Sequence, residues 1–107
     1  MNAEKIWNNI IAQLSDSSEE IATVPRNSRE PLWFSASIEN GNLYINNATN
    51  HRPSTSLSIK RKISKSDFEK VYPYYFRLAD GETNLVKEVA AISMNSAYIY
   101  ALIAKFE

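Results

Sequence analysis

Cysteine is absent from this sequence of 107 residues, and histidine and glycine are scarce, with one and two residues. The lack of cysteine excludes disulfides, thiolate zinc sites and cysteine nucleophiles together, and it leaves the redox compartment open. Gly41 and Gly81 are too few and too far apart for a glycine-rich phosphate loop or a dinucleotide fingerprint. His51 has no thiol or second imidazole with which to share a metal ion. We therefore expect neither a metal nor another cofactor.

Long apolar runs and an excess of either charge are missing as well. No stretch approaches the roughly 20 apolar residues of a membrane span, and residues 1–7 lack the basic and apolar regions of a signal peptide. These features predict a cytoplasmic protein that does not enter a membrane. The twelve basic and twelve acidic residues cancel, so attraction to a charged partner must come from local clusters. The length and the 44% of hydrophobic residues predict one domain, residues 1–107, with its own core.

Paired carboxylates, which general acid–base catalysis could use, occur at Glu19/Glu20 and at Asp67/Glu69. We place the first pair in a polar loop over residues 15–20. The second pair is explained by the preference for acidic residues at a helix N-terminus. The sequence therefore predicts a protein that is not a conventional enzyme.

Hydrophobic periodicity predicts a helix followed by strands. Apolar residues at three-to-four spacing over residues 2–15 indicate an amphipathic helix with Asn2 as its N-cap. Residues 21–24 are a candidate short strand. Residues 32–38 and 42–46 are strand-like and flank Asn40-Gly41, a strong hairpin signal because both turn positions need positive φ.

Residues 56–63 alternate between apolar and polar, which predicts a further strand with one buried and one exposed face. We expect Leu57, Ile59 and Ile63 to be buried, and Lys60 and Lys62 to be exposed. Arg61 falls on the inward side, where it would pair with an acid or lie at the sheet edge.

Helical periodicity returns after residue 63. Ser66 followed by Glu69 is typical of a capping box, Pro73 predicts a kink or break, and Asp80-Gly81 should end this segment. Thr83 can cap a following helix, and residues 97–106 carry the apolar spacing of a last one. This order predicts an α+β fold: an N-terminal helix, a three- to four-stranded antiparallel meander, and C-terminal helices packed on one face of the sheet.

The segment from His51 to Lys65 holds five of the twelve basic residues and no acid. Strand parity leaves four of these side chains free to meet a phosphate: Arg52, Lys60, Lys62 and Lys65. Trp33 or Tyr44 could then stack on a base, so nucleic acid is one candidate partner. The alternative is that these lysines only protect an edge strand from aggregation.

Aromatic residues gather in the C-terminal half of the chain. Pro73 is followed by Tyr74, Tyr75 and Phe76, which cannot all face one core, so at least one ring should be half exposed. The rings either close the core or form an interface, for which a homodimer is the second candidate partner. A small-ligand pocket is a further alternative. The candidate interface or pocket residues are Trp33, Tyr44, Tyr74, Tyr75, Tyr98 and Tyr100.

A helix-turn-helix is resembled by one segment near the C-terminus, which consists of residues 85–92, a short joint and residues 97–100. The joint has no glycine, however, and the second helix offers no basic residue before Lys105. Base reading usually draws on Arg, Lys, Asn or Gln at the helix start. A packed helical hairpin is therefore favoured.

Two blocks of the C-terminal half also carry a resemblance to a group of proteins. The first is Arg61-Lys62-Ile63-Ser64 with residues 68–73, and the second is Asn95-Ser96-Ala97-Tyr98-Ile99 with residues 101–103. In these blocks the chain resembles small uncharacterised bacterial proteins of mobile gene cassettes (integron cassettes). The resemblance implies a stand-alone accessory protein that acts as a binding or regulatory module, and it brings no catalytic residue.

Overall fold

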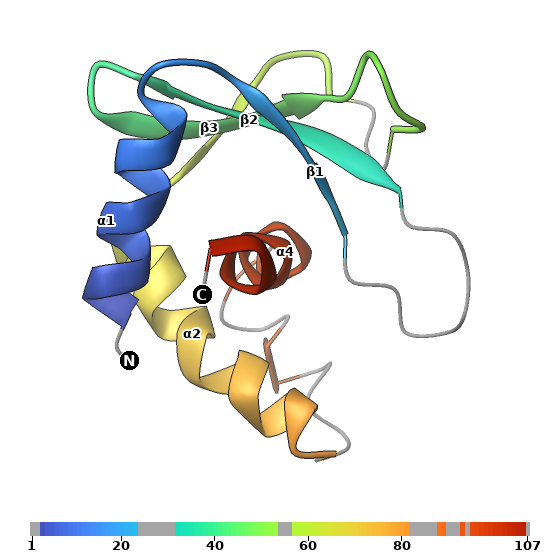
Figure 1. Cartoon of the computed structure of the whole chain (residues 1–107). Helices are drawn as coiled ribbons and strands as arrows, with labels where there is room; N and C mark the ends of the chain where they lie inside the picture. The colour runs from blue at the N-terminus through green and yellow to red at the C-terminus, as the bar shows by residue number, and fades with distance from the viewer. Residues whose placement is uncertain are drawn as a thin grey trace.

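The fold has two layers, a sheet and a set of helices beneath it, as Figure 1 shows for the computed structural model. The structure describes residues 3–23, 32–53, 57–81, 88–89, 93 and 95–106. The elements along the chain are α1 (Ala3–Leu14), β1 (Glu19–Ala22), β2 (Trp33–Glu39), β3 (Asn42–Asn47), β4 (Arg61–Ile63), α2 (Lys65–Ala79) and α4 (Ser96–Phe106). The predicted α+β class is confirmed.

The sheet is an antiparallel meander with the strand order β1-β2-β3-β4. Asn40 and Gly41 join β2 to β3 with φ angles of 53° and 78°. Both turn positions thus adopt the positive φ that the right-handed twist of a two-residue hairpin requires. The predicted hairpin is confirmed, and it sets the pairing of the two longest strands.

Side chains alternate between the two faces of the sheet. Most of the inward positions are apolar and buried, and the described helices cover them from below (Figure 1). The half-buried Asn47 and Arg61 are polar inward residues near the ends of β3 and β4. The core combines this inner face with the buried stripes of the helices: Ile6, Ile10, Leu14, Ile21, Phe34, Ala36, Leu43, Ile45, Ile63, Phe68, Val71, Ile99, Ala101, Leu102 and Ile103. None of the described helices is long and apolar enough to cross a membrane.

The strand predicted for residues 56–63 is shorter than expected. β4 spans only Arg61–Ile63, and Ile59, expected to be buried, is 79% exposed. Asn47 explains the early end of the pairing. Its side chain accepts a hydrogen bond from the Leu57 amide at 2.9 Å and donates one to the Leu57 carbonyl at 3.0 Å. Since this side chain takes the backbone groups that a β-ladder would use, residues 57–60 leave the sheet; Ser56 lies outside the described residues.

Two element boundaries also differ from their prediction. β1 begins at Glu19, so the acidic pair lies in a strand and not in a loop. α2 begins at Lys65 because Ser64, not Ser66, is the cap: its hydroxyl accepts a hydrogen bond from the Asp67 amide at 3.1 Å.

α2 continues through Pro73 without the break considered from the sequence. It ends where expected, with the Asp80 amide bonded to the Phe76 carbonyl at 3.0 Å and Gly81 at a φ of 87°. The predicted caps Asn2 and Thr83, and most of the first helix of the hairpin over 85–92, lie outside the described residues.

Candidate functional site

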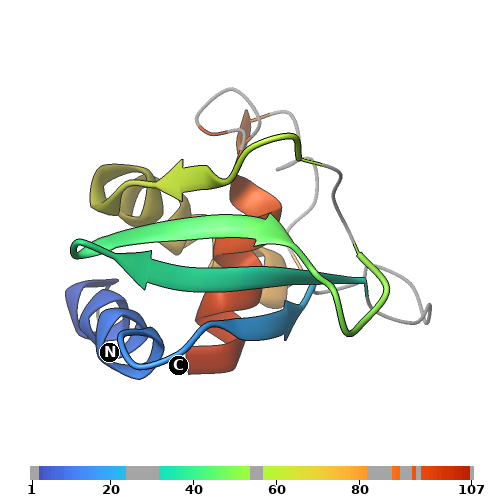
Figure 2. The ribbon, with the colours of Figure 1, turned by 90° about the horizontal axis from the view of Figure 1, so that it is seen from above.

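One face of the sheet is covered by none of the described helices. Figure 2 shows the strands in front of all the described helices, which lie behind them. The register places ten side chains on this outer side. We call this surface the open face: Glu20, Ala22, Trp33, Ser35, Ser37, Glu39, Asn42, Tyr44, Asn46 and Lys62.

Tyr44 lies in the middle of the open face. It is half-buried, with Ser37 directly opposite on β2 and Lys62 directly opposite on β4. The Lys60 ammonium lies over its ring, 4.6 Å from the centroid, and also donates a hydrogen bond to the Glu39 carboxylate. A partly accessible aromatic ring thus has one lysine above it and a second, exposed lysine beside it.

The Glu20 carboxylate closes one end of the open face. It accepts hydrogen bonds from three consecutive backbone amides, those of Thr49, Asn50 and His51, at 2.8, 2.8 and 2.9 Å. The Thr49 hydroxyl at 3.2 Å and the His51 Nδ1 at 2.8 Å complete the set. Successive amides that converge in this way form an anion-binding concavity. Here the chain's own carboxylate fills it and fixes residues 49–51 against β1.

These hydrogen bonds make the Glu20 carboxyl group a stronger acid. The Asn50 amide, together with the Thr49 amide and the His51 ring, lowers the pKa of Glu20 from 4.5 to about 2, against the opposing effect of desolvation. Glu20 is therefore ionised at neutral pH.

We expect Glu20 to make the stability of the fold dependent on pH. Because its pKa is lower in the folded chain (about 2) than the ordinary 4.5, its contribution is complete above about pH 4.5 and disappears as the pH falls toward about 2. Glu20→Gln should therefore lower the Tm by roughly 5–10 °C at about pH 5. The difference from the wild-type protein should shrink as the pH approaches about 2.

The matched control is Glu19→Gln, since Glu19 is the exposed neighbour on the same strand. Thermal unfolding followed by circular dichroism should show a small Tm change for this variant at every pH. A Glu20→Gln deficit that persists undiminished at about pH 2 would show that the lost carboxylate charge is not its cause.

Trp33 and His51 make an aromatic pair beside this end. Their ring centroids are 4.0 Å apart and their planes differ by 17°, so the rings stack. Arg52, the next residue after His51, is exposed. Its carbonyl accepts a hydrogen bond from the Trp33 amide at 2.8 Å. The Glu20 interactions therefore fix the stacked indole and imidazole at one end of the sheet, with the exposed Arg52 next along the chain.

The four predicted phosphate-binding residues do not form one patch. Lys60 and Lys62 flank Tyr44, and Arg52 follows His51 at the Trp33 end of the sheet. Lys65 lies apart from them, in the first turn of α2, with its Nζ 4.0 Å from a Glu4 carboxylate oxygen of α1.

The predicted tyrosines other than Tyr44 lie in the helical layer and pack against the core. The Tyr75 ring lies 6.1 Å from that of Tyr100, and Tyr98 meets Phe34 edge-on at 5.2 Å. Tyr74 donates a hydrogen bond to Glu88 at 3.0 Å, and this bond raises the pKa of Tyr74. One neighbouring ring, Phe76, is 37% exposed.

A polar network connects Arg61 of β4 with Asp67 of α2 and with Ser93 and Asn95. The Asp67 carboxylate accepts hydrogen bonds from the Ser93 hydroxyl at 2.7 Å and from the Asn95 amide group at 2.8 Å. Arg61 donates to the Asn95 side-chain oxygen at 3.4 Å, and its guanidinium lies 6.0 Å from the Tyr98 ring centre. Arg61 thus turns inward as predicted. It contacts the Asn95 side chain and the Tyr98 ring, and Asn95 in turn is hydrogen-bonded to the acid, Asp67. This network joins β4, α2 and α4.

Sequence reasoning missed Glu20 and the Asp67 network as organising features. Glu20 meets residues 29 to 31 positions away in the chain, and no local pattern signals such a contact. No three His, Asp or Glu side chains of the described residues come together as metal ligands. The described hollow at the sheet edge is lined by Trp33 but by neither Tyr44 nor Tyr75.

Comparisons of the whole chain with protein-family profiles, with curated protein sequences and with solved structures find no match.

Proposed function

We propose that this protein is a non-enzymatic binding module that holds single-stranded nucleic acid on the open face. The observation that carries the proposal is the Tyr44 ring with Lys62 directly opposite it on β4 and the Lys60 ammonium 4.6 Å from its centre. Flat aromatic rings accept bases of any kind by stacking, and neighbouring ammonium groups suit the phosphates between them. The resemblance to cassette proteins agrees with a small accessory binding role.

The rest of the open face suits the same ligand. Ser35 and Ser37 of β2, with Asn46 opposite Ser35 on β3, supply hydrogen-bonding groups on the same face. No described acid lies within ion-pair distance of Lys62 or Arg52, so both charges are available to phosphates. Because Lys60 shares its charge with Glu39 and Lys65 lies elsewhere, we expect two or three phosphate contacts and a modest affinity.

The proposal is tested by titrating a fluorescent single-stranded oligothymidine at several salt concentrations. The wild-type affinity should fall with salt with a log–log slope of about −1.4 to −2.1, at about 0.7 per phosphate contact. Lys62→Glu should weaken binding about tenfold and make the slope shallower by about 0.7.

The matched control is Lys70→Glu, which makes the same charge change at an exposed lysine on α2. Equal losses for Lys62→Glu and Lys70→Glu would show that net charge alone governs binding. Absence of binding by the wild-type chain at low salt would overturn the proposal.

Self-association is the second candidate. It is favoured by the exposed Phe76 ring on α2, next to the half-buried Tyr72 and Tyr75, which meet it edge-on at 5.1 and 5.2 Å. A sedimentation run that shows only monomer at high protein concentration would remove it.

A further inference from the structure

The outer edge of β1 has backbone groups that no described residue binds. β1 stands at the end of the sheet, with β2 on one side only. The Thr23 amide donates to the Leu32 carbonyl at 2.8 Å. Since the residues of an antiparallel strand point their amides and carbonyls alternately to either side, Ile21 and Glu19 also face β2. The backbone groups of Glu20 and Ala22 therefore point outward.

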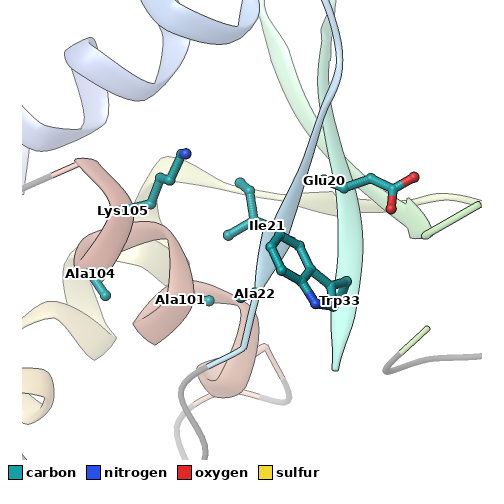
Figure 3. A pocket seen from close by; sticks show the side chains of 7 residues that line it. All are labelled: Glu20, Ile21, Ala22, Trp33, Ala101, Ala104 and Lys105. Atoms are coloured by element: carbon teal, nitrogen blue, oxygen red, sulfur yellow. The ribbon is translucent and has the colours of Figure 1, made fainter. Parts of the chain in front are cut away.

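A hollow of about 280 Å³ lies beside these same residues (Figure 3). Three consecutive residues of β1 line it, so it opens along the edge of the strand and not over one face. Trp33 of β2 and α4 complete the lining, which is Glu20, Ile21, Ala22, Trp33, Ala101, Ala104 and Lys105. The small side chains of Ala101 and Ala104 leave room for an additional side chain above α4.

The charge at this hollow favours an acidic occupant. Glu20 and Lys105 are the charged residues of the lining. The Glu20 carboxylate is taken up by residues 49–51 and points away from the hollow (Figure 3). Lys105 is exposed in the last turn of α4, and no described acid pairs with it. An incoming carboxylate would therefore meet an available ammonium group.

We propose that the edge of β1 binds an extended acidic peptide, which adds to the sheet as a further strand between β1 and Lys105. The peptide backbone pairs with the outward groups of Glu20 and Ala22. One apolar side chain enters the hollow over Ala101 and Ala104, and an acidic side chain reaches Lys105. Strand addition of this kind takes its affinity from backbone hydrogen bonds and its specificity from alternate side chains. This edge borders the open face and shares Trp33 with it. The proposal rests on the backbone of β1 and on α4, and it does not require nucleic-acid binding.

The experiment is a selection of random phage-displayed dodecapeptides on the wild-type chain, with Ala104→Trp protein as a soluble competitor. Ala104 is exposed, so tryptophan should fill the hollow without entering the core. Enriched peptides should alternate apolar residues and contain Asp or Glu. In calorimetric titrations of the synthetic peptides, Ala104→Trp should abolish measurable binding. Lys105→Glu should weaken binding at least about tenfold, and the distant Lys70→Glu should leave it unchanged.

N-methylation of the peptide separates strand addition from simple apolar binding. Methyl groups on alternate peptide amides, those that would face β1, should abolish binding, whereas methyl groups on the other amides should leave it intact. Enrichment without acidic residues, or equal effects of both methylation patterns, would overturn the proposal. A wild-type dimer in sedimentation that Ala104→Trp dissociates would also overturn it, because the edge would then serve a second copy of the chain.

Discussion

Phe68→Ala should lower the free energy of unfolding by about 3–5 kcal/mol. Phe68 is a fully buried residue of α2, with its ring 5.4 Å from that of Trp7 on α1 and 6.1 Å from that of Tyr72 on α2 itself. Its removal loses both the transfer of the ring from water and the contacts that a cavity cannot restore. Since domains of this kind are stable by only about 5–15 kcal/mol, urea unfolding should show a large shift of the midpoint.

The same change at Phe76 is the matched control. Phe76 lies two turns further along α2 and is 37% exposed, with edge-on contacts to Tyr72 and Tyr75. Its replacement by alanine should cost about 1–2 kcal/mol. Comparable losses for both variants would mean that the packing between α1 and α2 contributes no more than a half-exposed ring does.

Asp67→Ala should lower the free energy of unfolding by about 2–3 kcal/mol. The carboxylate accepts hydrogen bonds from Ser93, which is 6% exposed, and from Asn95. Without it these donors lose their partner, and the Ser93 hydroxyl is buried. An unsatisfied buried donor costs more than an ordinary hydrogen bond contributes. The loss should appear in equilibrium urea unfolding monitored by circular dichroism.

Glu69→Ala is the control for this variant, because Glu69 is an exposed acid on the same helix. Its effect should stay within about 0.5 kcal/mol. If the two alanine variants unfold alike, solvent must reach Ser93 and Asn95 and replace the carboxylate.

The hairpin and the layer order could be predicted because their signals are local. Asn40 and Gly41 adopt the positive φ angles that their residue types favour, and the apolar and aromatic character of residues 32–38 and 42–46 predicted the two strands that they join. The strand before α2 could not be bounded in this way. The alternation from Leu57 to Ile63 continues past the point where Asn47 takes the Leu57 backbone groups, and a contact over ten positions leaves no trace in periodicity.

The same distinction between local patterns and long-range contacts applies to the candidate sites. Strand parity correctly placed Lys62 on the outer side, opposite Tyr44. It could not show that Lys65 would lie beside Glu4, because that depends on how α1 and α2 pack. Glu20 was assigned to a loop on composition, yet its carboxylate organises residues 49–51. A free edge with its outward backbone groups can be found only after the strand order is known.

Trp33 stands at the boundary between the open face and the hollow at the edge of β1: its ring stacks on His51 and also lines the hollow. Both proposed ligands would therefore contact Trp33. A nucleic acid that moves this ring must change the affinity for the peptide by the same factor by which the peptide changes the affinity for nucleic acid, because binding free energies are reciprocal. The Trp33 indole would thus couple the binding of the two ligands.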